Sequence, residues 1–237
     1  MIHKWAIAAA VTGVTVVGTL AAPAQAITLG EIGNGFLDVG DKRFSNFQCA
    51  LSTSDMALLV PNSCDEIKIN TIENSPFGID IQGPFSVTNF ASPDTEFLET
   101  LISFDVEALD PTKAINSINL AFNGAFAGNG KASVKETARV DGTIVAELMV
   151  SNPYEGGSDL QDPALEGEDF DLATPYKKLN ITKEIRVEAE AGGSAEISSI
   201  VQTYDQTEVP EPGTIGGLLA VGSLGVGSIL KQLKKKK

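Results

Sequence analysis

Apolar and polar residues alternate at every second position along much of the chain between residues 79 and 189. Successive side chains of a β-strand point to opposite faces of the sheet, so this pattern predicts strands that are buried on one face only. Five sets of apolar residues follow it: Ile79, Ile81, Phe85 and Val87; Ile102, Phe104, Val106 and Ala108; Ile118, Leu120 and Phe122; Ile144, Ala146, Leu148 and Val150; and Leu179, Ile181, Ile185, Val187 and Ala189. Each apolar face needs a second layer to exclude water from it.

Turn residues lie between these runs. Asp141-Gly142 and Gly192-Gly193 suit two-residue hairpin turns, and Asn123-Gly124 and Asn129-Gly130 indicate further breaks between strands. Two more strands are expected at residues 44–51 and 66–72, which makes about nine to eleven in all. We therefore expect a mainly β fold, an antiparallel β-sandwich over residues 27–208, flanked by an N-terminal signal helix and a C-terminal transmembrane helix.

Residues 1–26 have the features of a secretory signal peptide. A single lysine precedes an uncharged apolar run over residues 5–20, and Ala24-Gln25-Ala26 supplies the small residues that signal peptidase requires. We expect cleavage between Ala26 and Ile27, and export by the general secretion machinery. An uncleaved N-terminal anchor is the alternative.

Residues 209–237 consist of three parts. The tripeptide Pro210-Glu211-Pro212 comes first, residues 214–230 carry no formal charge, and residues 231–237 hold five lysines. As a helix the uncharged part is roughly 25 Å long, near the lower limit for crossing a bilayer. Lysine-rich flanks stay on the cytoplasmic side, so the preceding domain is expected outside the cytoplasm.

This tail resembles the PEP-CTERM sorting signal of Gram-negative bacteria, including cyanobacteria. The resemblance covers only residues 209–237, and the basic end departs from the pattern in having lysine but no arginine. It implies that exosortase, an integral-membrane cysteine protease or transpeptidase, recognises the tail and cuts near Pro210-Glu211-Pro212. It also implies transient anchoring in the membrane, followed by residence at the cell surface or among exopolysaccharide. Residues 40–49 resemble the start of an exported β-rich domain of some cyanobacterial proteins of this class.

The region between the two end segments is acidic. Residues 27–209 hold 30 of the 31 acidic residues and 11 of the 17 basic ones, a formal net charge of −19. Nucleic acid and anionic lipid are poor partners for such a surface. The only cysteines, Cys49 and Cys64, predict one disulfide in an exported chain. A free catalytic thiol is the alternative, but the only histidine is His3, in the signal peptide.

Residues 152–175 interrupt the strand pattern and predict a long acidic loop rich in Pro and Gly. Its carboxylates are Asp159, Asp162, Glu166, Glu168, Asp169 and Asp171. Calcium takes six to eight oxygen ligands, so these residues are candidates for a calcium site, the one cofactor that the sequence suggests. The spacing of an EF-hand is absent, and a solvated loop is the alternative.

Several catalytic classes are excluded by composition. The mature region has no histidine, which excludes a Ser-His-Asp triad and histidine-ligated metals. Its aromatic surface for sugar stacking is limited to phenylalanine and to Tyr154, Tyr176 and Tyr204, of which the first two flank the acidic loop. We therefore expect a non-enzymatic component of the cell surface or extracellular matrix. A carbohydrate- or calcium-binding module of the envelope is the alternative, and an acid-dependent glycosidase ranks third because no carboxylate pair stands out.

Processing of the tail is directly measurable. We expect mass spectrometry of the exported protein, from cells with active exosortase, to find no chain that ends at Lys237. Recovery of the intact Lys237 terminus from those cells would contradict the sorting prediction.

Overall fold

The computed structural model describes residues 26–54, 61, 63–152 and 166–209, with only the backbone at residues 152, 166 and 167. Most of the predicted signal peptide, the Pro210-Glu211-Pro212 motif and the segments 214–230 and 231–237 lie outside these ranges, so those predictions are untested. Within the ranges, no helix is long and apolar enough to span a bilayer. The predicted cleavage site directly precedes the first strand, since Ala26 is exposed and Ile27 begins β1.

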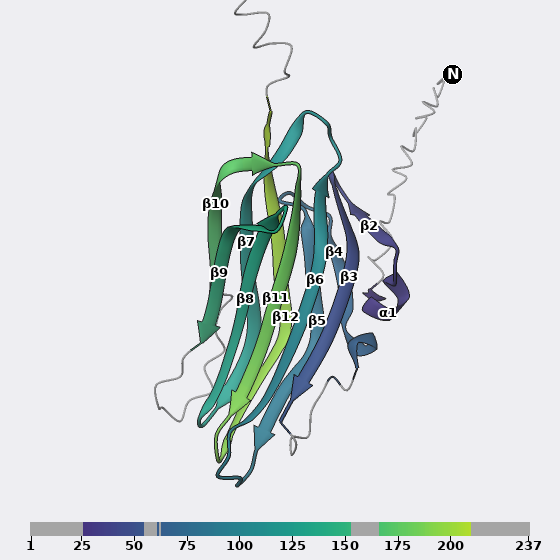
Figure 1. Ribbon diagram of the computed structural model, residues 1–237. Helices are drawn as coiled ribbons and strands as arrows, with labels where there is room; N and C mark the ends of the chain where they lie inside the picture. The colour runs from purple at the N-terminus through teal and green to yellow at the C-terminus, as the bar shows by residue number, and fades with distance from the viewer. Residues whose placement is uncertain (1–25, 55–60, 62, 153–165, 210–237) are drawn as a thin grey trace, which may run out of the picture.

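Twelve strands in the described ranges form two antiparallel six-stranded sheets stacked face to face (Figure 1). The first sheet has the order β1 (Ile27–Thr28), β4 (Lys68–Ile72), β5 (Gly78–Asn89), β12 (Gly193–Glu208), β7 (Lys113–Ala127) and β10 (Glu166–Tyr176). The second has the order β2 (Phe36–Val39), β3 (Lys42–Thr53), β6 (Glu96–Ala108), β11 (Lys178–Ala189), β8 (Gly130–Val140) and β9 (Thr143–Asn152). The predicted antiparallel β-sandwich is confirmed, with more strands than expected because β1 and β2 are too short to show alternation and β10 lies in the segment assigned to the acidic loop.

The alternating apolar residues fill the space between the sheets. All the residues predicted for the buried faces are buried except Ile144, which is 50% exposed. A register shift between Ala138 and Arg139 causes this difference, because Ala138 pairs with Ala146 whereas Arg139 pairs with Ile144. The extra residue in β9 is a β-bulge, which turns Ile144 to the outer face.

The predicted turns have different outcomes in the structure. Asp141 and Gly142, with φ of 48° and 80°, form the predicted hairpin turn between β8 and β9. The predicted hairpin at Gly192-Gly193 is wrong, because the turn there leads from β11 in the second sheet to β12 in the first. Asn123-Gly124 is no break either, since both residues lie within β7.

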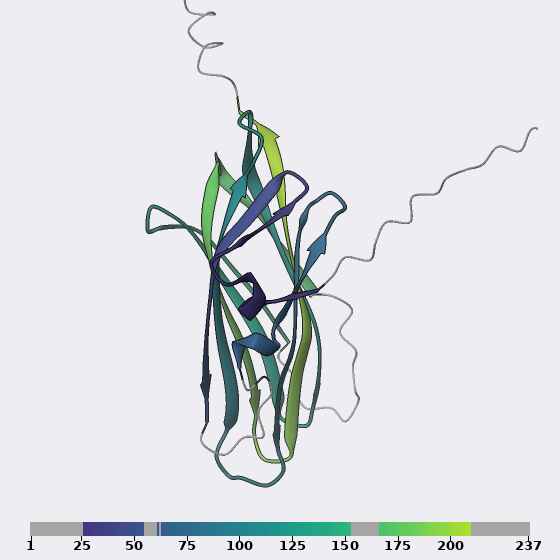
Figure 2. The same ribbon diagram turned by 90° about the vertical axis from the view of Figure 1, so that its right-hand side faces the viewer.

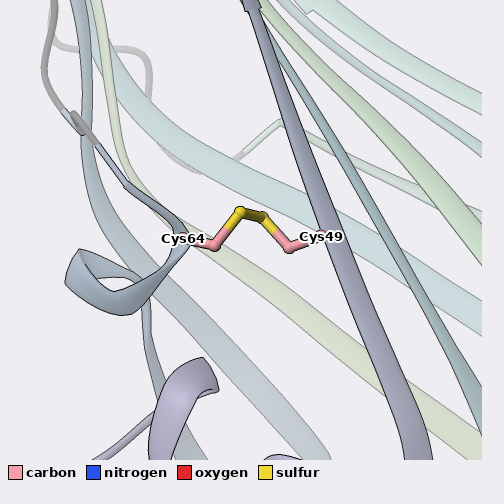
Figure 3. The surroundings of a disulfide bond; sticks show 2 residues. All are labelled: Cys49 and Cys64. Atoms are coloured by element: carbon pink, nitrogen blue, oxygen red, sulfur yellow. A yellow bond between two sulfur atoms is a disulfide. The ribbon is translucent and has the colours of Figure 1, made fainter.

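One edge of the sandwich is closed by short helices and a disulfide. The helix α1 (Leu29–Ile32) and the 3₁₀ turn η1 (Cys64–Glu66) lie between the two sheets at this edge (Figure 2). The predicted Cys49–Cys64 disulfide is present, with a Cα–Cα distance of 6.0 Å (Figure 3). It connects β3 of the second sheet to η1, which leads into β4 of the first.

The predicted acidic loop is wrong for its second half, because residues 166–175 belong to β10, an edge strand paired with β7. Leu172 is buried and Phe170 packs against the core, while Asp169 and Asp171 alternate with them and are exposed. Two inward apolar side chains and pairing with β7 therefore attach this acidic strand to the sandwich. At this edge the carboxylate of Glu168 accepts a hydrogen bond from the backbone N–H of Met149 in β9, at 2.6 Å, which occupies a donor on an edge strand.

Replacing both cysteines, as in Cys49→Ser with Cys64→Ser, should lower the free energy of unfolding by about 3 kcal/mol, since the bond closes a loop with a sequence separation of 15 residues. Urea unfolding of the two proteins measures this difference. Reductant should destabilise the parent protein and leave the double variant unchanged; equal unfolding free energies would contradict the role given to the disulfide.

Candidate functional site

The outer face of the second sheet carries two aligned rows of polar side chains. Antiparallel pairing places Ser45, Asp105, Asn180 and Arg139 next to one another across β3, β6, β11 and β8. The adjacent row consists of Gln48, Ser103, Thr182 and Thr137. Neighbouring strands lie about 4.8 Å apart, so each row is a line of closely spaced hydrogen-bonding groups.

A bulge in β3 brings one further amide to this face. The pairing of β3 with β6 shifts between Ser45 and Gln48, and Asn46 within the shift has a φ of 57°. Asparagine tolerates this left-handed conformation better than most residues. The bulge aims the Asn46 side chain at β6, where its amide nitrogen donates to Oδ2 of Asp105 at 2.6 Å.

Asp105 is the centre of the site, and its side chain is 12% exposed. Besides the bond from Asn46, Oδ2 accepts one from Nζ of Lys178 at 2.9 Å, and Oδ1 accepts one from the amide of Asn180 at 3.0 Å. Burial by itself would raise the pKa of the Asp105 carboxyl, but the bonds from Lys178, Asn180 and Asn46 and the charge of Lys178 together hold that pKa below its usual value. Asp105 is thus a fixed carboxylate at neutral pH.

Two hollows in the surface share Asp105 and Asn180. One, of about 540 Å³, is lined by residues at the end of the sheet: Asp105, Arg139, Val140, Asp141, Gly142, Tyr176, Lys177, Lys178 and Asn180. The other, of about 430 Å³, is lined by Asn34, Asn46, Phe47, Gln48, Ser103, Asp105, Asn180 and Thr182. We call the pair of hollows the Asp105 groove. It combines amides, hydroxyls, a guanidinium and a fixed carboxylate with one tyrosine.

The Asp105 groove differs in charge from the rest of the domain. Arg139, Lys177 and Lys178 line it together with only two carboxylates, Asp105 and Asp141, whereas residues 27–209 have a net charge of −19. Within the described part of the chain, the Arg139 side chain makes one polar contact, from Nη1 to Oγ1 of Thr182 at 3.4 Å, and keeps donors for a ligand. The groove therefore suits a neutral or weakly anionic ligand.

The calcium candidates do not form a cluster in the part of the chain that the structure describes. Asp159 and Asp162 lie outside it, as does the side chain of Glu166. Glu168 and Asp169 are consecutive strand residues on opposite faces, and Glu168 is bound to Met149. Within the described ranges, no group of three or more His, Cys, Asp or Glu residues is placed to hold a metal ion.

The tyrosines lie in different parts of the protein. Tyr176 lines the Asp105 groove, whereas Tyr204 is fully buried, with its ring centroid 5.9 Å from that of Phe44. Tyr154 lies outside the described ranges. Sequence reasoning missed Asp105, Asn180 and Asn46, because outward polar residues on a strand are ordinary and only the pairing register aligns them.

Comparisons with known proteins give no family for the chain. No family model matches it, and no curated protein matches it. Among solved structures, one similar chain is the carbohydrate-binding module TmCBM61 in complex with β-1,4-galactotriose: 13% identity, 66% of this chain and 88% of that chain covered, TM-score 0.33. Another is the isomalto-dextranase of Arthrobacter globiformis T6 complexed with panose: 13% identity, 69% and 35% covered, TM-score 0.28. At such scores neither ligand transfers to this chain.

Asp105→Asn should destabilise the fold at pH 7, by on the order of 1–3 kcal/mol, because it replaces a charge-assisted network with neutral contacts. A carboxyl whose folded-state pKa is lowered stabilises the fold above its unfolded pKa of about 3.9, and this contribution disappears as the pH falls through the folded-state pKa. Chemical unfolding of the parent and of the Asp105→Asn variant should show a smaller difference in unfolding free energy at pH 3 than at pH 7. Glu147→Gln, at an exposed residue of the same sheet, should change the unfolding free energy little at either pH. A difference between the parent and Asp105→Asn that is the same at both pH values would contradict the lowered pKa of Asp105.

Proposed function

We propose that the chain is an exported, non-enzymatic β-sandwich protein that binds polysaccharide outside the cell through the Asp105 groove. The observation that carries this proposal is the fixed Asp105 carboxylate within aligned rows of amides and hydroxyls. Sugars present many hydroxyl groups, each of which both donates and accepts hydrogen bonds, so a surface of mixed donors and acceptors fits them.

The groove is organised before any ligand arrives. Three donors, two from β11 and one from the bulge in β3, hold Asp105, and Oδ1 of its carboxylate keeps a lone pair that can accept from a hydroxyl. Preorganised polar groups bind more tightly because little conformational entropy is lost on association. Tyr176 supplies an aromatic side chain at one end, as sugar stacking requires.

A binding role is better supported than hydrolysis. Glycosidases use one carboxylic acid with a raised pKa as proton donor and a second carboxylate as base or nucleophile. The pKa of Asp105 is shifted the other way, because donors and a lysine surround it. Asp105 is therefore unsuited to donate a proton near neutral pH.

The sequence signals supply the route of delivery in this proposal. Signal peptidase would cut between Ala26 and Ile27, the membrane would hold the chain through residues 214–230, and exosortase would act near Pro210-Glu211-Pro212. The sandwich would then remain at the cell surface or in the matrix, with exopolysaccharide as the natural ligand of the groove. Calcium binding by the acidic residues between 159 and 171 is the alternative that the sequence raises.

Binding should weaken when groove residues are shortened. We expect Arg139→Ala to weaken binding about tenfold or more, because a hydrogen bond to a charged group contributes roughly 1.5–3 kcal/mol. Asn180→Ala should also weaken binding, because Asp105 loses a donor that positions its carboxylate. A glycan array identifies the polysaccharide, and calorimetry with that glycan measures the affinities. Neutral and uronate-containing glycans form separate arms of the array.

Lys135→Ala is the matched control. Lys135 is a cation on the same face of β8 as Arg139 and does not line the groove. Its replacement should leave the affinity unchanged. Equal affinities for all three variants, or no binding of the parent protein to any glycan, would contradict the proposal. Release of shortened glycans would instead support the hypothesis that the protein is a glycosidase.

A further inference from the structure

Three polar side chains meet in the middle of the apolar core. Lys183 on β11 and Glu136 on β8 are directly paired in the second sheet, and Gln202 contacts Lys183 from β12 of the first sheet. All three are completely buried. Nζ of Lys183 donates hydrogen bonds to Oε2 of Glu136 and to Oε1 of Gln202, so it joins the two sheets across the core.

The surroundings of these three residues exclude water. The side chains two positions away on each strand share their inward face and are all buried: Val134 and Ala138 on β8, Ile181 and Ile185 on β11, and Ile200 and Tyr204 on β12. Among the described residues, Nε2 of Gln202 and Oε1 of Glu136 have no hydrogen-bond partner of good geometry. A buried polar atom without a partner is rare and calls for an explanation.

Burial also shifts the pKa values of Lys183 and Glu136. Loss of hydration lowers the pKa of Lys183 and raises that of Glu136, although each group's charge opposes the shift of the other. Transfer of one proton from Lys183 to Glu136 converts the ion pair into a neutral amine and a neutral carboxyl. A desolvated neutral lysine amine is a nucleophile.

We propose that Lys183 and Gln202 form an intramolecular amide bond that joins the two sheets covalently, with Glu136 as the residue that transfers the proton. The attacking nitrogen is already hydrogen-bonded to the carbonyl oxygen of the carboxamide, one bond away from the carbon that it attacks. Fixing both groups in this way in a folded core gives the reaction the advantage of an intramolecular process.

The reaction balances without any co-reactant. The Lys183 Nζ–Gln202 Cδ bond forms and the Gln202 Cδ–Nε2 bond breaks. Starting as the neutral carboxyl, Glu136 gives its proton to the departing nitrogen, which leaves as ammonia, and takes a proton from the attacking nitrogen. The carboxyl of Glu136 ends in the protonation state in which it began, and nothing is oxidised or reduced.

Gln202 is the better acceptor of the two carbonyl groups near Nζ. Its Nε2 is a buried donor without a hydrogen-bond partner of good geometry among the described residues, and release of ammonia removes this atom from the core. Attack on Glu136 would instead release water and would consume the group that transfers the proton. Only the bond to Gln202 connects the two sheets, because Glu136 and Lys183 belong to the same one.

Peptide mapping of the full-length protein tests the bond. The protein is denatured, reduced and digested with trypsin and a glutamate-specific protease. We expect a branched peptide that joins residues 179–184 to residues 197–208, lighter than the sum of its two parts by one ammonia. Separate linear peptides, or cleavage after Lys183, would overturn the proposal, and a branched peptide lighter by one water would assign the acceptor to Glu136 instead.

Variants separate the roles of the three residues. Lys183→Met and Gln202→Leu should each give only linear peptides. Glu136→Gln keeps both Lys183 and Gln202 but should also give only linear peptides. A branched peptide from this variant would overturn the role of Glu136. Glu147→Gln, at an exposed glutamate of the same sheet, should keep the branched peptide in full. The parent measurement does not depend on any variant folding, and its outcome is independent of ligand binding in the Asp105 groove.

Discussion

The structure depends on the burial of two apolar sheet faces against each other. Each face exists because apolar residues recur at every second position, as in Ile102, Phe104 and Val106 of β6, all fully buried. Apolar burial contributes roughly 25 cal/mol for each Å² removed from water, and no other interaction in the sandwich acts over a comparable area. The disulfide, α1 and the Glu168–Met149 bond close the edges of a core that alternation has already defined.

The sequence predicted what local periodicity controls and missed what depends on pairing between distant strands. Alternation located the buried faces, and Asp141-Gly142 located a hairpin, because both are properties of a few consecutive residues. Ile144 was misplaced because a bulge in a paired strand decides its face. Gly192-Gly193 marked a reversal correctly, but the sheet that receives the next strand is set by packing of the whole domain.

The candidate site lay beyond sequence reasoning for the same reason. Asn46, Asp105 and Asn180 meet through contacts that span 59 and 75 positions of the chain. Each residue alone looks like an ordinary outward-facing side chain of a half-exposed strand. Tyr176 was found, although as a residue flanking a loop, because aromatic residues are scarce in this chain. The register of β3, β6 and β11 converts these scattered residues into one groove.

The same strands place charged groups in two contrasting environments. On the outer face of β6, Asp105 keeps its charge because water and three donors reach it. On the inner face of β11 and β8, Lys183 and Glu136 are completely buried, and burial shifts the pKa of each toward its neutral form. The outer face thus suits reversible recognition and the inner face suits covalent chemistry, although both are built on one sheet.

Ligand mapping by nuclear magnetic resonance tests the central claim of polysaccharide recognition most directly. Titration of the protein with the glycan selected on the array should shift the side-chain amide signals of Asn46, Gln48 and Asn180, which line the groove. The signals of Asn70 and Gln82, on β4 and β5 of the opposite sheet, should stay unchanged. Shifts confined to the opposite sheet, or no shifts at saturating glycan, would contradict the account.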